Sequence, residues 1–326
     1  MDRPVALLFP GQGAQQAQMA KGLFEHDPVF TEEMVRACRA MGEVGQSLLD
    51  DWLSESPEVG VDATLRSQPL LYAVGYALGR MVRSWGVRPS AVLGHSVGEL
   101  VAAVIAGVFE PDAAARVCWR RLAPLLDAPQ GGMLAVAAAP GDIARFLTGG
   151  VEVAAYNAPR QVILSGPWPA LSATVEALTE AGITCRPVAS QTPFHNSLLA
   201  APARATTGLF AALEPRPPRI PLYSTRTGAL LDGRAAADPE FWSMQAATPV
   251  LFWQAIEALL QRDGLVLVEA GPGQMLSRLA RRHPKVRAGN AMVVPLLPVR
   301  SGDPAQDRLT AHEARDALGS FEAAQR

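Results

Sequence analysis

The sequence predicts an α/β protein whose parallel sheet is interrupted by a smaller unit of mixed strands and helices. Apolar segments at residues 5–9, 90–93, 221–224 and 265–269 have helical patterning between them. Such alternation is typical of parallel strands that are covered by helices. Between residues 131 and 191 the segments shorten and follow the order β-α-β-β-α-β, which is the split βαβ pattern of a ferredoxin-like unit.

The first half of the core begins with the strand at 5–9. Pro10-Gly11-Gln12-Gly13 follows, a turn that brings backbone amides close to whatever lies beyond it. Helical patterning covers 30–53 and 68–85. The strand at 90–93 then runs directly into a glycine-rich turn and an apolar helix that ends near residue 107.

The smaller unit comes next, and we expect it to form a subdomain of residues 131–191 inserted in a core of residues 1–130 and 192–326. Its expected strands and helices, in chain order, are 133–139, 141–147 (helix), 151–156, 161–165, 168–181 (helix) and 184–189.

The second half of the core resumes the α/β pattern. Helices are expected around 198–213 and at 250–261, and a basic helix is expected after the strand at 265–269. A polar, alanine-rich tail predicts a peripheral helix over 307–324.

Composition excludes several classes of protein. Apolar residues make up 49% of the 326 and charged residues 18%, enough for a large buried core and unlike a disordered chain. The net charge of −2 gives no global attraction to nucleic acid or to an anionic membrane. Cys38, Cys118 and Cys185 are too far apart in sequence for a C-x-x-C metal site or a disulfide framework. Without a signal-peptide core or a membrane-spanning apolar stretch, we expect a cytoplasmic protein that binds no metal.

Gly94-x-Ser96-x-Gly98 matches the nucleophile elbow, in which a serine stands on a sharp turn between a strand and a helix. The two glycines permit that turn, and the amide of Val97 would point at an oxyanion. The expected strand before the motif and the helix after it favour Ser96 as a nucleophile over a chance match.

A serine nucleophile needs a base, and the chain has five histidines. His26 and His312 lie in polar segments, His283 lies in a basic run, and His95 belongs to the elbow itself. His195 lies in a loop at the junction of the two units, where substrates usually bind. Elimination favours His195 as the base, although a lone histidine is more often structural.

Several motifs resemble the malonyl-CoA:acyl-carrier-protein acyltransferase family, which includes free-standing fatty-acid enzymes and polyketide synthase acyltransferases. They lie in the family's order, cover residues 7 to about 300, and comprise residues 9–15, 67–69, 94–99, 156–159, 162–166, 194–195 and 269–273. The resemblance implies a hydrolase-like α/β core with the inserted ferredoxin-like subdomain.

The same resemblance implies roles for the elbow and its partners. Ser96 would take an acyl group from a thioester, with His195 as general base and then general acid. The amides of Gln12 and Val97 would form the oxyanion hole. A backbone carbonyl, at the position that matches Gln245, would orient the histidine in place of a carboxylate.

Arg121 occupies the place, 25 residues after the serine, of an arginine in relatives that load malonyl-type groups. A guanidinium can hold the free carboxylate of such a group in a bidentate pair. Arg120 is the competing candidate, since one of the two arginines should be an ordinary exposed helix residue. Pro124 could kink the helix here and shift Arg121.

Three further residues resemble family pocket positions. Phe194 resembles the bulky residue of malonyl-selective members, though simple packing would also explain it. Asn157 and Gln68 could bond the thioester region or could satisfy loop backbone. A basic cluster after the turn at 271–273 would either steer anionic partners or form a solvated helix face; it comprises Arg278, Arg281, Arg282, Lys285 and Arg287.

The expected function is ping-pong transfer of a malonyl group from coenzyme A, through Ser96, to the phosphopantetheine thiol of an acyl carrier protein. The setting would be polyketide or fatty acid biosynthesis, with the enzyme acting in trans, no cofactor bound and the coenzyme A thioester as substrate. Alternatives are transfer of a larger acyl chain between carrier proteins, editing hydrolysis of stalled chains, and an inactive protein that only binds carrier protein. A nucleotide site is disfavoured, because no G-x-G-x-x-G with an acidic partner follows a strand.

Overall fold

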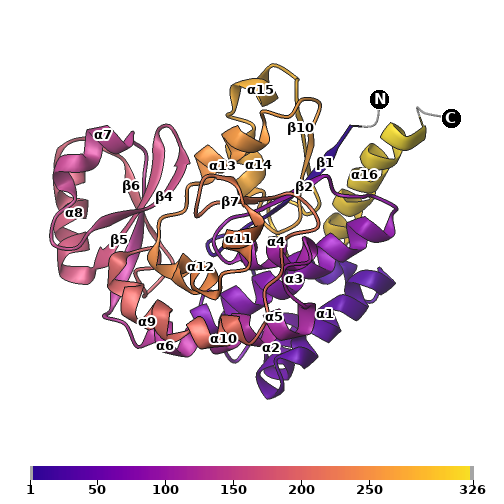
Figure 1. The fold of residues 1–326 in the computed structure, drawn as a ribbon, viewed down its shortest axis with the longest axis horizontal. Coiled ribbons are helices and arrows are strands. Elements are labelled where there is room, and N and C mark those ends of the chain that lie inside the picture. The colour runs from indigo at the N-terminus through magenta and orange to yellow at the C-terminus, as the bar shows by residue number, and fades with distance from the viewer. Residues whose placement is uncertain (1–2, 324–326) are drawn as a thin grey trace.

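The computed structural model describes residues 3–323 and divides into a core and a small lobe (Figure 1). The core sheet has the strand order β10-β9-β1-β2-β7-β8. Its strands are β1 (Val5–Phe9), β2 (Ala91–Gly94), β7 (Leu222–Ser224), β8 (Ala229–Leu230), β9 (Val266–Glu269) and β10 (Met292–Pro295). All neighbouring pairs are parallel except β7 and β8. The four expected strands are confirmed, and β8 and β10 are additional.

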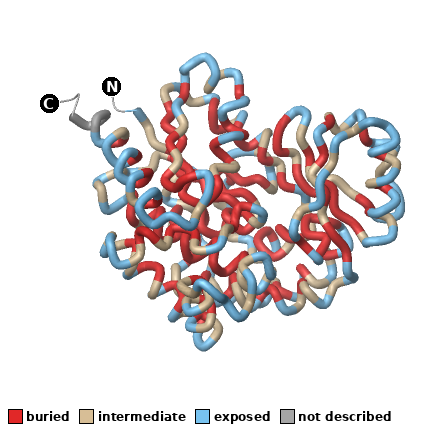
Figure 2. The backbone as a smooth tube through the Cα atoms, turned by 180° about the vertical axis from the view of Figure 1, so that it is seen from behind, coloured by how far each residue is buried: buried red, intermediate tan, exposed pale blue. Residues whose placement is uncertain are grey.

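Both faces of this sheet are covered, because side chains alternate across each strand. Leu7 and Phe9 belong to the apolar cluster under the N-terminal helices. Ala6 and Leu8 belong to the opposite cluster, which includes residues of α13 (Phe252–Leu259) and α14 (Met275–Ala280). Figure 2 shows buried backbone concentrated inside the molecule, with exposed backbone in the outer helices and loops.

The N-terminal helices differ in their bounds from the helical patterning. They are α1 (Pro28–Ala40), α2 (Glu43–Leu53), α3 (Thr64–Ser84), α4 (Gly98–Ile105), α5 (Pro111–Arg120) and α6 (Leu122–Leu126). The helical patterning over 30–53 corresponds to two helices, because Gly42, at φ 75°, separates α1 from α2. Glycine reaches this left-handed region without the steric cost that other residues incur.

The small lobe has the antiparallel sheet order β4-β5-β3-β6. Its strands are β3 (Gly131–Val136), β4 (Glu152–Ala158), β5 (Gln161–Pro167) and β6 (Cys185–Val188), and its helices are α7 (Pro140–Ile143), the 3₁₀ helix η2 (Ala144–Phe146) and α8 (Trp168–Glu180). This arrangement confirms the ferredoxin-like prediction. A bridge between Ala155 and Val250 joins the lobe to the core.

The remaining helices complete the core, and the helix expected over 198–213 is divided. They are η1 (Lys21–Leu23), η3 (Ser197–Leu199), α9 (Ala200–Ala205), α10 (Thr207–Ala211), α11 (Gly233–Ala236), α12 (Pro239–Ser243), η4 (Met244–Ala247), α13, α14, α15 (Pro284–Arg287) and α16 (Pro304–Ala323). The tail helix therefore begins three residues earlier than expected, and its expected last residue, 324, lies outside the described residues. Across residues 3–323, none of these helices has the length and apolar character to span a bilayer.

Candidate active site

Ser96 lies on a strained turn at the carboxyl end of β2, with α4 beginning two residues later. Its φ of 54° is in the left-handed region that non-glycine residues rarely adopt. The turn also requires both flanking glycines. A Cβ on Gly94 would lie 2.2 Å from the carbonyl oxygen of Gly98, and a Cβ on Gly98 would lie 2.1 Å from that of Phe9. The sequence motif is therefore explained by close packing of the elbow against itself and against β1.

His195 reaches this serine from the loop after β6. Its Nε2 lies 2.7 Å from Ser96 Oγ. Its Nδ1 lies 2.9 Å from the carbonyl oxygen of Thr248 and 3.1 Å from that of Gln245. Because both carbonyls only accept, the proton belongs on Nδ1 and the Nε2 lone pair faces the serine hydroxyl.

Burial lowers the pKa of His195 to about 4, and the hydrogen bonds to Thr248 and Gln245 partly oppose that shift. The imidazole is therefore neutral near pH 7, the state that a base needs. The structure places the Gln245 carbonyl where the resemblance implied. It adds the Thr248 carbonyl, which sequence reasoning missed because a backbone acceptor leaves no residue-type signature.

The two expected oxyanion-hole residues flank Ser96. Val97 is the N-cap of α4, immediately after the serine. Gln12 lies in the turn after β1, and the preceding Gly11 packs so closely that a Cβ there would lie 2.4 Å from the carbonyl oxygen of His95. Both backbone segments therefore border the nucleophile, and their role as oxyanion donors stays a prediction.

Arg121 lies between α5 and α6, so the helical segment is interrupted three residues before Pro124. Pro124 is the third residue of α6, and a proline in a first turn leaves no intrahelical hydrogen bond unmade. The side chain of Arg121 is 4% exposed, whereas Arg120 is exposed. Burial favours Arg121 over Arg120 as the candidate for an interior role.

The side-chain amides of Gln68 and Gln12 connect Arg121 to the turn after β1 that carries Gln12, called the oxyanion turn below. Arg121 Nη2 donates to Gln68 Oε1 at 2.8 Å, and Gln68 Nε2 donates to Gln12 Oε1 at 3.0 Å. Burial lowers the pKa of Arg121, but a guanidinium stays charged in proteins. Within residues 3–323, no carboxylate forms an ion pair with it. A buried cation without an anion is costly, and a carboxylate ligand would remove that cost.

The Ser96–His195 pair is called the dyad below. A cavity of about 210 Å³ opens beside it, between the core and the small lobe. Its walls are Gln12, Gly13, His95, Ser96, Met133, Ala135, Ala155, Asn157, Gln161, Ile163, Val188, Phe194, His195 and Met275. Phe194 also packs in an apolar cluster with Leu125 and Leu199, so it both packs and lines the cavity. Asn157 Oδ1 lies 2.8 Å from His95 Nε2. Its partner is therefore a side chain, whereas the expected alternative was a bond to loop backbone. Arg121 and Gln68 do not line this cavity, but Gln68 bonds to Gln12 in its wall.

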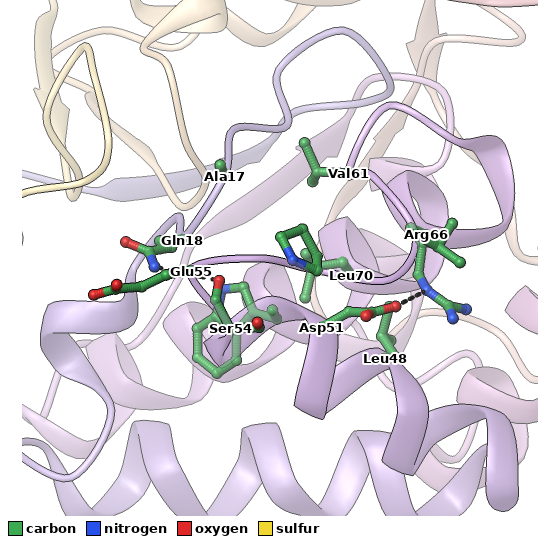
Figure 3. Close-up of a pocket in the computed structure, with 12 residues that line it drawn as sticks. Ala17, Gln18, Leu48, Asp51, Ser54, Glu55, Val61, Arg66 and Leu70 are labelled. Carbon is green, nitrogen blue, oxygen red and sulfur yellow. Dashed lines mark hydrogen bonds and ion pairs between the residues drawn. The ribbon is translucent and has the colours of Figure 1, made fainter.

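A larger cavity of about 370 Å³ lies elsewhere, between α2, the loop that follows it, and α3 (Figure 3). Its most polar feature is an ion pair, with Arg66 Nε 2.7 Å from Asp51 Oδ2. It shares no lining residue with the dyad cavity and contains no nucleophile paired with a base. Chemistry therefore places the candidate active site at the smaller cavity.

The basic cluster extends from α14 through the turn that follows it to α15, close to the dyad cavity. Its four arginines are all exposed: Arg278, Arg281, Arg282 and Arg287. Its lysine forms an ion pair, with Lys285 Nζ 3.2 Å from Asp263 Oδ1. Arg282 donates to Gln161 Oε1, and Gln161 and Met275 both line the cavity. The cluster therefore borders the cavity, and its expected contact with partners stays a prediction.

Comparison with known proteins identifies the family of this chain. Residues 6–319 match the family described as the acyl transferase domain. A phenolphthiocerol/phthiocerol polyketide synthase from Mycobacterium tuberculosis is 36% identical over 281 residues, covering 86% of this chain and 19% of that protein. Polyketide synthase GfsB of Streptomyces halstedii is 36% identical over 309 residues, covering 93% of this chain and 6% of that protein. The chain thus spans a fifth or less of the length of these curated relatives.

Solved structures have the same fold. The acyl transferase domain of SpnD in complex with 2-(pent-4-yn-1-yl)malonyl superposes with a TM-score of 0.91 at 31% identity, covering 98% of this chain and 77% of that one. The acyl-carrier-protein S-malonyltransferase from Burkholderia pseudomallei superposes with a TM-score of 0.81 at 26% identity, covering 96% of this chain and 99% of that one.

Proposed function

This chain belongs to the acyl transferase domain family, and from that premise we propose that it transfers a malonyl group from coenzyme A through Ser96 to an acyl carrier protein. The observation that carries the proposal is the 2.7 Å contact between Ser96 Oγ and His195 Nε2. The imidazole is held by two backbone carbonyls, so the Nε2 lone pair is aimed at the hydroxyl. A hydroxyl paired with a neutral, oriented imidazole is the arrangement of an activated nucleophile.

The reaction follows from this geometry in two half-reactions. His195 takes the hydroxyl proton while Ser96 Oγ attacks the thioester carbonyl, and the amides of Gln12 and Val97 stabilise the resulting oxyanion. The carbon–sulfur bond then breaks, and His195 returns the proton to the departing coenzyme A thiolate. In the second half-reaction the phosphopantetheine thiol gives its proton to His195 and attacks the acyl-serine ester, and the serine oxygen recovers a proton from His195.

The malonyl assignment is supported by Arg121. A carboxylate bound to its guanidinium would neutralise a buried cation that has no anionic partner within the described chain. The link through Gln68 to Gln12 would place that carboxylate near the oxyanion turn. An acetyl group would leave the cation unpaired, which provides a physical basis for selectivity.

A larger acyl chain is the second candidate cargo, and the cavity wall favours it. Met133, Ala135, Ala155, Ile163 and Val188 give the dyad cavity an apolar surface from all four strands of the small lobe. Arg121 does not line this cavity. An extended apolar group could therefore lie against the small lobe.

The test is the intact mass of the wild-type protein after incubation with malonyl-CoA, acetyl-CoA and medium-chain acyl-CoAs. We expect a mass increase of one malonyl group, located at Ser96 by peptide mapping and lost when a carrier protein with a free phosphopantetheine thiol is added. Adducts of medium-chain groups without malonyl would favour the second candidate. No adduct from any thioester would contradict acyl transfer and favour an inactive carrier-binding protein.

Acceptor recognition is proposed for the basic cluster. Acyl carrier proteins are acidic and coenzyme A carries phosphates, so a positive surface beside the cavity would attract both even though the net charge is −2. Reversing two charges, with Arg281→Glu and Arg282→Glu, is expected to raise the KM for carrier protein and to weaken the dependence of that KM on salt. The rate at which Ser96 is acylated by a truncated thioester, which lacks the phosphates of coenzyme A, should be unchanged. Steady-state transfer at several ionic strengths would measure this.

A matched control carries the same charge change on a different surface. Arg116→Glu with Arg315→Glu alters two exposed arginines on α5 and α16, which contribute no residue to the cavity. This pair should leave the KM for carrier protein unchanged. If both double variants changed the KM for carrier protein equally, the basic cluster would be an ordinary solvated surface and not a binding site.

A further inference from the structure

A carboxyl group is buried directly behind the dyad, and the mechanism above does not use it. Glu99 lies in the first turn of α4, three residues after Ser96, and is 1% exposed. Its Oε2 accepts hydrogen bonds from Gln245 Nε2 at 3.0 Å and from Thr225 Oγ1 at 3.1 Å. Three segments far apart in sequence therefore meet at one oxygen atom: the elbow helix, the loop after β7, and η4.

Gln245 connects this oxygen to both members of the dyad. Its Nε2 also donates to the backbone carbonyl of Ser96 at 2.9 Å. Its own backbone carbonyl accepts from His195 Nδ1 at 3.1 Å. One glutamine thus contacts the backbone of the nucleophile through its side chain and the base through its main chain, and Glu99 holds that side chain in place.

The burial of Glu99 is costly, which argues against a merely space-filling role. Burial raises its pKa, while hydrogen bonds from neighbouring side chains oppose the shift. Its Oε1 is buried and accepts no hydrogen bond within residues 3–323. Unsatisfied buried polar atoms are rare and destabilising, so they call for an explanation. Of the two side-chain hydrogen bonds that Glu99 accepts, the one from Gln245 leads to both reacting groups.

We propose that Glu99 is a positioning residue that, through Gln245, holds the segment carrying Ser96 and the segment that orients His195 at the separation the dyad needs. It would do indirectly what the carboxylate of a Ser-His-Asp triad does by touching the imidazole. This inference rests on the proposed roles of Ser96 and His195.

The experiment compares single-turnover acylation of Ser96 by malonyl-CoA in Glu99→Ala, Glu99→Gln and Gln245→Ala. Glu99→Ala is expected to lower the acylation rate constant about 10- to 100-fold with little change in KM, as loss of an orienting partner usually does. Glu99→Gln keeps a carbonyl oxygen that can accept from Gln245 and should restore most of the rate. The double variant Glu99→Ala/Gln245→Ala should be no slower than the slower single variant, because both changes break the same connection.

A readout without substrate separates this inference from the proposed function. The Nδ1 proton of His195 is expected to be protected from solvent exchange in proton NMR of the wild type, and to exchange faster in Glu99→Ala and in Gln245→Ala but not in Glu99→Gln. The exchange rate therefore tests the role of Glu99 even if the wild type forms no acyl adduct. The absence of an adduct would contradict the proposed function and not this inference. Should Glu99→Ala fail to fold, Gln245→Ala carries the same expectations.

Asp307→Asn is the matched control for loss of a buried carboxylate. Asp307 is 1% exposed and accepts from the backbone amide of Gly22 at 3.0 Å, away from the dyad cavity. This variant should lower the unfolding temperature without changing the acylation rate or the exchange rate of the His195 Nδ1 proton.

Three results would each overturn the proposal. They are a wild-type acylation rate in Glu99→Ala, equal losses of rate in Glu99→Ala and Glu99→Gln, and additive losses of rate in the double variant.

Discussion

Ser96→Ala is expected to abolish the acyl-enzyme, and with it transfer to any acceptor. The substitution removes the oxygen atom that His195 Nε2 contacts at the elbow, so no covalent intermediate can form there. Loss of a serine nucleophile typically lowers turnover by about 10⁶-fold. Intact mass spectrometry after exposure to malonyl-CoA would show an unmodified protein.

Two controls make this result specific. Ser84→Ala removes a hydroxyl that bonds the carbonyl of Met81 at the end of α3, and it should acylate at the wild-type rate. Circular dichroism and the unfolding temperature would establish that Ser96→Ala is folded. A stable adduct on folded Ser96→Ala would show that another residue is the nucleophile.

Arg121→Ala is expected to lower malonyl transfer by about 10²- to 5 × 10³-fold in kcat/KM while affecting acetyl transfer far less. In the wild type the carboxylate of a malonyl group would pair with the buried guanidinium. In the variant the same carboxylate would enter a buried site without a partner, a loss typically of about 3–5 kcal/mol when one member of a buried pair is removed. Competition between malonyl-CoA and acetyl-CoA for Ser96, followed by mass spectrometry, would measure the change.

The neighbouring arginine provides the control for this prediction. Arg120→Ala removes an exposed guanidinium one residue away and should change the transfer of neither acyl group. Arg121→Lys should recover only part of the malonyl rate, since an ammonium cannot form the bidentate pair. Equal losses with malonyl-CoA and acetyl-CoA in Arg121→Ala would mean that Arg121 acts by supporting Gln68 and Gln12, and that it does not recognise a carboxylate.

Local patterns predicted most of the fold. The apolar segments that became β1, β2, β7 and β9 are continuous because both faces of a parallel sheet are buried. The order of elements between 131 and 191 was sufficient to predict the ferredoxin-like lobe. Other elements had weaker signals. β8 has only two residues, both exposed, and β10 has only four, of which one is buried.

Helix lengths were less predictable than strand positions. Apolar periodicity continues from α1 into α2, but Gly42 adopts a left-handed conformation at which the chain leaves one helix and starts another in a new direction. A second interruption lies at Arg121, between α5 and α6, three residues before Pro124 and with dihedral angles that stay in the right-handed helical region. Apolar periodicity alone does not indicate where a helix is interrupted in this way.

For the candidate site, the sequence by itself determined the residues whose side-chain type and local turn carry the chemistry. Gly94, Ser96 and Gly98 form a contiguous motif because the elbow is a local backbone conformation with no room for a Cβ at either glycine. Tertiary structure alone decided which carbonyls hold His195, that Thr248 joins Gln245 in doing so, and that Glu99 lies behind both. The two contacts to His195 use backbone oxygens that every residue possesses, and the side-chain contact between Gln245 and Glu99 joins residues 146 positions apart. A pattern of residue types cannot report them, and only the folded chain brings them together.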